Sequence, residues 1–163
     1  MSDKPPVLSW GHININVSNL DESIAFYQKL GFSMLLPGIP YLDLTASQGL
    51  SKMPSAAAHA LAMPVQSEGR ACIMQLDNGF PKIDLVEWSD AGQQPPLGNA
   101  DLGLVRFCLA SQDLAKDYAS LVEQGVQFLS EPQTTKDGKA DIAVCTDPDG
   151  SLIELIQIYF EKW

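Results

Sequence analysis

The chain has 163 residues, of which 45% are hydrophobic, and a formal net charge of −10 at pH 7. This length and apolar content suffice for one domain, or for two small modules that share a core. An acidic surface repels phosphate backbones, and no apolar run approaches the roughly 18 residues of a membrane span, so we expect neither a nucleic-acid-binding nor a membrane protein.

The N-terminus and the cysteines indicate the compartment. The first ten residues, MSDKPPVLSW, lack the charged and then apolar pattern of a secretion signal. Cys72, Cys108 and Cys145 are well separated and lie among strand-like residues, which favours reduced thiols over a disulfide framework. We therefore expect a cytoplasmic protein.

The first 90 residues predict a strand, a helix and several further strands. Residues 10–17 alternate between apolar and polar side chains, and the polar face of this expected strand carries His12, Asn14 and Asn16. An amphipathic helix is expected over 21–30, ending at a glycine. Further strands are expected over 32–36, 41–45, 71–76 and 82–88.

Residues 46–70 interrupt this regular pattern. They are rich in Ala, Met and Ser and contain two prolines, with a short helix expected over 55–62. His59 lies within this segment and is expected to be exposed, with a role as a lid ligand as the alternative.

The second half of the chain repeats the first. After a polar, proline-containing linker over 91–100, a second module over 101–163 predicts a strand, a helix and three more strands, with a DPDG turn before the last. The two opening strand–helix stretches align at a constant offset of 94 residues. The closing strands align at an offset of 70, and the difference of 24 matches the size of the irregular segment 46–70.

This alignment pairs four polar positions, His12 with Arg106 and Asp84 with Glu154. Because the first and last strands of each module are expected to be close, these side chains can share one concave face. An imidazole and two carboxylates are the ligands that divalent Mn, Fe, Co, Ni or Zn takes in proteins. Four further residues are predicted to line a substrate site: Asn14, Trp88, Cys108 and Ile156.

The chain resembles the vicinal oxygen chelate superfamily, which includes glyoxalase I, extradiol dioxygenases and bleomycin resistance proteins. Four stretches carry the resemblance: GHININVSNLDESIAFYQKLGF, KIDLVEW, SQDLAKDYASLVEQGV and TDPDGSLIELIQ. The resemblance implies an α+β fold in a single domain over 1–163, with module one over 8–90. It also implies two paired βαβββ modules that form a curved mixed sheet around a central cavity, with helices outside, and a homodimer.

In that superfamily the metal ligands come from the four paired positions. The resemblance therefore implies a divalent metal (Fe, Mn, Ni, Co or Zn) held by His12, Asp84 and Glu154. Arg106 departs from the pattern, because a guanidinium is always cationic and cannot ligate a metal. In one hypothesis Arg106 turns aside to bind an anionic substrate group. In the other hypothesis, the protein is metal-free and Arg106 pairs with both carboxylates. Electrostatic repulsion between the arginine and a divalent cation favours this second hypothesis.

The resemblance implies a glyoxalase-like enzyme of isomerase, lyase or oxygenase type that works through an enolate or oxyanion. His12, Arg106 and Glu154 are the expected catalytic residues, and the substrate is a small, partly hydrophobic molecule. The alternative is a non-catalytic protein of the same fold that sequesters a drug or metabolite, as resistance proteins do.

Overall fold

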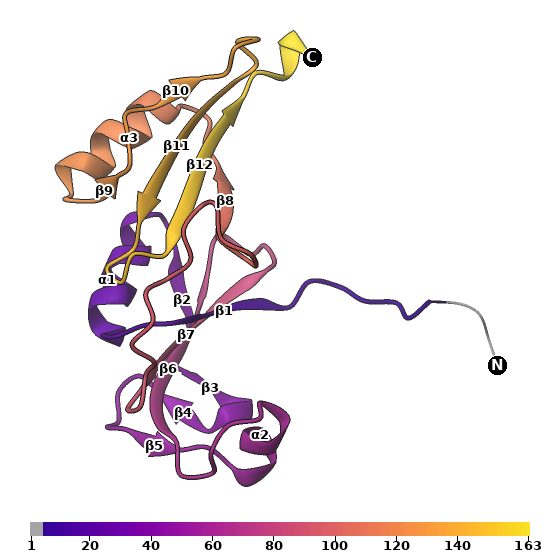
Figure 1. The fold of residues 1–163 in the computed structure, drawn as a ribbon, viewed down its shortest axis with the longest axis vertical. Helices are drawn as coiled ribbons and strands as arrows, with labels where there is room; N and C mark the ends of the chain where they lie inside the picture. The colour runs from indigo at the N-terminus through magenta and orange to yellow at the C-terminus, as the bar shows by residue number, and fades with distance from the viewer. Residues whose placement is uncertain (1–4) are drawn as a thin grey trace. The chain divides into compact units, whose positions relative to one another are not determined.

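The computed structural model describes residues 5–163, which divide into two compact units (Figure 1). The first comprises residues up to Leu20 together with Gly31–Ala91, and the second comprises Asp21–Leu30 and Gly92–Trp163. Residues 1–4 lie outside the described residues. They are part of the N-terminal stretch from which we expect no secretion signal. Among residues 5–163, no helix has the length and apolar character needed to cross a membrane.

The first unit contains a mixed sheet in the order β1-β7-β6-β2, with β5 also paired to β6. The pair β1–β7 is parallel and the other pairs are antiparallel. The strands are β1 (His12–Asn16), β2 (Ser33–Leu36), β5 (Ser51–Lys52), β6 (Glu68–Gln75) and β7 (Lys82–Trp88). A separate hairpin joins β3 (Gly38–Ile39) to β4 (Leu44–Thr45).

The stretch between β2 and β6 is more ordered than its composition predicts. The strand expected over 41–45 is partly wrong, because Pro40–Leu42 form a 3-10 turn that Asp43 closes in the left-handed conformation, with φ of 53°. Proline at the start of such a turn is favoured, since its φ is already fixed near the helical value. The expected short helix is confirmed as α2 (Ser55–Ala60).

This stretch has its own apolar core, which is packed onto the sheet. Its buried side chains join two from β6 and β7 in one cluster: Ile39, Leu42, Leu44, Met53, Ala58, Ala71 and Val86. Figure 1 shows β3 and β4 lying beside β6 in the first unit. The sequence predicts an insertion over 46–70, and those bounds stay a prediction. We call residues 38–62, which overlap it and include β3, β4, β5 and α2, the inserted segment.

The second unit contains a second mixed sheet, in the order β10-β11-β12-β8, with β9 paired to β11. Its strands are β8 (Arg106–Ala110), β9 (Gln127–Phe128), β10 (Gln133–Thr134), β11 (Ala140–Thr146) and β12 (Leu152–Ile158). Helix α3 (Leu114–Glu123) lies beside β11 and β12, as Figure 1 shows. Helix α1 (Leu20–Lys29) belongs to this unit from Asp21 onward. The expected α+β class is confirmed, and neither sheet closes on itself.

The DPDG turn is held by the first of its aspartates. The Oδ1 atom of buried Asp147 accepts hydrogen bonds from the backbone N–H groups of Asp149 and Ser151, at 3.0 and 2.8 Å. Its Oδ2 atom accepts one from the Tyr27 hydroxyl of α1, at 3.1 Å. Burial raises the pKa of Asp147, and burial together with the nearby carboxylate raises the pKa of Tyr27. This motif therefore has a structural role.

The strand register confirms the alignment of the two modules. In the first unit β1 runs parallel to β7 with Asn14 opposite Asp84, and in the second β8 runs parallel to β12 with Cys108 opposite Glu154. These pairs differ by the same offsets of 94 and 70 residues that the sequence repeat gives. The opening and closing strands of each module are thus neighbours, as expected.

The repeat also preserves the capping of the helices. The backbone N–H of Leu20, at the start of α1, donates to Glu87 of β7 at 2.7 Å, and that of Leu114, at the start of α3, donates to Gln157 of β12 at 2.8 Å. The first N–H groups of a helix have no hydrogen-bond partner inside the helix. In both modules a side-chain oxygen of the closing strand accepts a hydrogen bond from one of these N–H groups.

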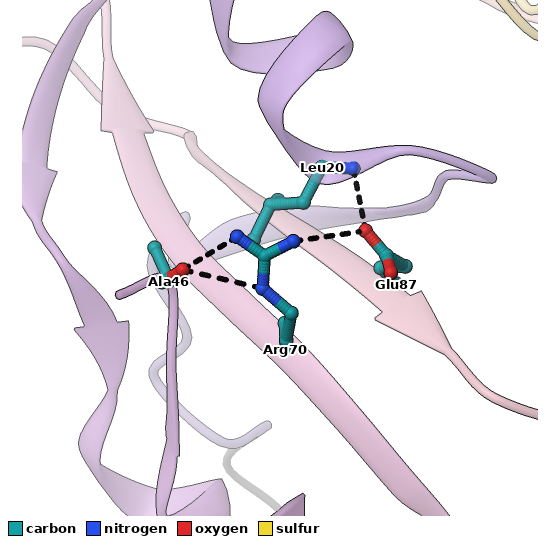
Figure 2. A network of polar contacts seen from close by, with 4 residues as sticks. All are labelled: Leu20, Ala46, Arg70 and Glu87. Carbon is teal, nitrogen blue, oxygen red and sulfur yellow. Dashed lines mark hydrogen bonds and ion pairs between the residues drawn. The ribbon is translucent and has the colours of Figure 1, made fainter. Parts of the chain in front are cut away.

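Glu87 also links the inserted segment to β6 and β7 (Figure 2). The same carboxylate oxygen lies 3.6 Å from Arg70, whose guanidinium donates to the carbonyl of Ala46 at 3.2 and 2.6 Å. Glu87 therefore has a structural role.

We predict that Glu87→Ala lowers the free energy of unfolding by about 1–2 kcal/mol, because it removes both the cap and the partner of Arg70. Glu87→Gln, which gives the first module the residue of the second, should cost less than about 1 kcal/mol, since the amide oxygen can still accept. Urea unfolding of the three proteins checks this. Equal losses for the two variants would contradict the capping role.

Candidate functional site

Three side chains of the first unit form a polar cluster around Asp84. Asp84 is only 1% exposed and lies in the middle of β7. One of its oxygens, Oδ2, accepts a hydrogen bond from the hydroxyl of Tyr41 and lies 3.5 Å from Nε2 of His12. The rings of His12 and Tyr41 are stacked, with centroids 5.9 Å apart and planes 20° apart. Strand β1 and the inserted segment thus meet at one carboxylate.

The second oxygen of Asp84 is an acceptor that the described residues leave unsatisfied. Oδ1 is buried and has no hydrogen-bond partner among residues 5–163. A buried polar atom without a partner is costly and commonly marks a binding or catalytic role. Burial, with the hydrogen bond to Asp84, raises the pKa of Tyr41, so this phenol stays a donor at neutral pH. His12 has 43% of its side chain exposed, so a ligand can reach it.

Two of the predicted substrate-lining residues lie in a neighbouring polar network. The amide of Asn14 and the indole N–H of Trp88 both donate to the side-chain oxygen of Asn16, at 3.0 and 3.1 Å. Trp88 also packs against the core of the inserted segment. Its ring therefore covers the apolar core as well as bordering the polar cluster.

In the second unit Arg106 pairs with Glu154. The Nε atom of Arg106 lies 2.6 Å from Oε2 of Glu154, and a terminal nitrogen donates to the amide oxygen of Asn99 at 3.0 Å. The Arg106 side chain is 37% exposed and that of Glu154 is 15% exposed. The expected pairing of Arg106 with Glu154 is present, while its pairing with Asp84 and a metal-free site stay predictions.

Cys108 and Ile156 flank this pair. Cys108 lies opposite Glu154 in the register, and half-buried Ile156 follows two residues after Glu154 on the same face of β12. Burial, with the nearby Glu154 carboxylate, raises the pKa of the Cys108 thiol to about 11, while Arg106 lowers it. Such a thiol is mainly protonated at neutral pH, which makes Cys108 a weak nucleophile.

The sequence interpretation missed two of these contacts. Tyr41 was expected as an ordinary strand residue, and Asn99 lies in the predicted linker. Neither position carried a signal, because each gains its role from a partner far away in the chain. His59 is exposed in α2, as expected, and its role as a lid ligand stays a prediction.

The comparison with protein families agrees with the paired modules and the DPDG motif. Residues 9–155 match the model of the Glyoxalase/Bleomycin resistance protein/Dioxygenase superfamily. The chain belongs to this superfamily.

Solved structures of the glyoxalase superfamily have the same fold. A glyoxalase family protein from Bacillus cereus aligns with a TM-score of 0.74 at 16% identity, over 97% of this chain and 99% of that one. Glyoxalase I from Zea mays aligns with a TM-score of 0.59 at 20% identity, over 90% of this chain and 43% of that one. These low identities establish the fold alone.

A curated relative matches part of the chain. The uncharacterized protein YurT from Bacillus subtilis is 42% identical over 55 residues, which span 34% of this chain and 42% of that protein. The match thus covers less than half of either protein.

A divalent metal is common in the glyoxalase superfamily, but in this chain an arginine stands at one of the four positions predicted to supply its ligands. The first unit offers two predicted ligands, His12 and Asp84, and the second offers Glu154, an oxygen of which is paired with Arg106. Among residues 5–163, no three His, Cys, Asp or Glu side chains are grouped to hold a metal. A catalytic zinc takes three protein ligands, and a guanidinium cannot be one. The predicted ligand set remains a prediction.

We predict that Cys108 reacts slowly with iodoacetamide at neutral pH, with a rate that rises towards pH 11, where the thiolate forms. Glu154→Gln should lower the apparent pKa because it removes a negative charge, and Arg106→Gln should raise it because it removes a positive one. Mass spectrometry can follow alkylation, since Cys72 and Cys145 are buried. Shifts in the opposite directions would contradict the described geometry.

Proposed function

We propose that this protein is a small-molecule enzyme that moves a proton on its substrate and stabilises the resulting enolate or oxyanion. The observation that supports this most strongly is the contact between half-exposed His12 and buried Asp84, whose second oxygen has no partner among the described residues. Catalytic sites are where buried carboxylates and accessible imidazoles are commonly combined.

His12 is the proposed general acid or base. Asp84 and the stacked ring of Tyr41 restrict the orientation of the imidazole, while its exposed side can meet a substrate proton. The Tyr41 hydroxyl, a donor to Asp84, fixes the carboxylate in turn. Such positioned acid–base groups contribute about 10²- to 10⁴-fold to a rate.

Arg106 is the proposed stabiliser of negative charge. Glu154 and Asn99 orient its guanidinium through Nε and one terminal nitrogen, and the remaining N–H groups can bind an oxyanion. This charge takes the part that a metal would otherwise have, and no proposed step uses a metal. Glu154 serves mainly as the partner of Arg106, and Ile156 offers an apolar contact to the substrate.

The remaining expectations are consistent with this function. No disulfide joins Cys72, Cys108 and Cys145, and a cytoplasmic location is proposed from the sequence. Homodimer formation is carried over from the family resemblance and is likewise a proposal.

The test is hydrogen exchange in D₂O with a panel of 2-hydroxy ketones, 2-hydroxy acids and hemithioacetals. We predict that the wild-type protein catalyses deuterium incorporation at the carbon next to the carbonyl of at least one compound, followed by proton NMR. His12→Ala should reduce this rate by about 10²-fold or more, and Arg106→Gln by about 10²-fold. Lys116→Gln, at an exposed position of α3, is the control and should leave the rate unchanged.

Two results would contradict the proposal. Full exchange in a variant lacking both His12 and Glu154 would remove the site assignment. Saturable binding of a panel compound without any exchange would favour the alternative function, a protein that sequesters its ligand.

A further inference from the structure

The inserted segment fills one end of the sheet face that carries Asp84. Side chains two residues apart on a strand share a face, so Asp84, Val86 and Trp88 lie on one face of β7. The register places Ala71 of β6 beside Val86. Onto this end pack five buried side chains of the inserted segment: Ile39, Leu42, Leu44, Met53 and Ala58. The chain itself thus occupies the apolar end of this face.

The other end of the same face is polar and carries a buried cation. Lys82, two residues before Asp84, is only 9% exposed and lies opposite His12 in the register. Its ammonium donates to the amide oxygen of Gln75 at 2.9 Å and lies 4.5 Å from the centroid of the Phe80 ring. Both partners are neutral, and no carboxylate of residues 5–163 forms an ion pair with it.

The fold does not require a cation at this position. The equivalent residue of the second module is Leu152, which is buried in the corresponding place on β12. Burying an ammonium without an opposite charge is costly. Asp84 is on the same face, but its Oδ2 contacts His12 and Tyr41. An anionic group supplied by a ligand would offset the cost of burying Lys82.

We propose that this end of the sheet face binds a small substrate through a carboxylate, held by Lys82 next to His12, and that the inserted segment excludes bulky apolar substituents. This inference rests on the proposed function and names the substrate class: short 2-hydroxy or 2-oxo acids. The apolar part of the substrate is correspondingly small. Lys82 is the anion-binding residue, and Leu44 and Met53 set the size limit.

The experiment measures binding of three probes to the full chain by NMR titration: lactate, lactamide and 3-phenyllactate. Wild-type protein should bind lactate about tenfold more tightly than lactamide, which lacks the charge, and than 3-phenyllactate, which is too large. Lys82→Met should remove the preference for lactate over lactamide. Lys52→Met, at the exposed position of β5, is the matched control and should keep the preference for lactate.

The size limit has its own variant. The double substitution Leu44→Ala and Met53→Ala should improve 3-phenyllactate binding about tenfold and leave lactate within about twofold, because it opens space only at the apolar end. Circular dichroism confirms folding, and Lys82→Met should fold at least as stably as the wild type, since it removes a buried charge.

Several outcomes would overturn the proposal: no binding of lactate, equal binding of lactate and lactamide, or a preference that survives Lys82→Met. Failure of the proposed function would look different. In that case the protein would still prefer lactate to lactamide in the titrations, but it would not catalyse deuterium exchange into any compound of the panel.

Discussion

The parallel pairing of the opening and closing strands, made once in each module, is the constraint on which the other features depend. It sets Asn14 opposite Asp84 and Cys108 opposite Glu154, so that equivalent positions carry the functional side chains. The same pairing brings a side-chain oxygen of each closing strand to the start of a helix. Because the register is fixed by burial of one face, a slip by one residue would turn every site residue away.

The two modules use this common frame differently. In the first, buried Asp84 contacts a histidine and a tyrosine that are partly exposed, an arrangement that suits the proposed proton transfer. In the second, Glu154 is paired with a permanent cation, which suits binding of negative charge. A partly exposed ion pair of this kind contributes little to stability, so its value is better sought in binding. We propose that the difference between His12 and Arg106 at equivalent positions is a difference of chemical role.

Much of the frame could be predicted from the sequence because it depends on local, periodic patterns. Alternating residues placed His12 on a polar face, and the offsets of the repeat gave the register that the strands adopt. The role of Tyr41 could not be predicted, since its hydroxyl meets Asp84 only after the turn at Pro40–Leu42 has folded back. The packing of the inserted segment onto the sheet face could not be predicted either, because it depends on tertiary contacts and the sequence of this segment has no regular periodicity.

We propose that Arg106, paired with Glu154, supplies the positive charge of the site in place of a metal. Elemental analysis of the protein, purified after growth with added Mn, Fe, Co, Ni and Zn, tests it most directly. The account predicts no stoichiometric metal in the wild type and metal uptake by Arg106→His. A stoichiometric divalent metal in the wild type, lost on His12→Ala, would contradict it.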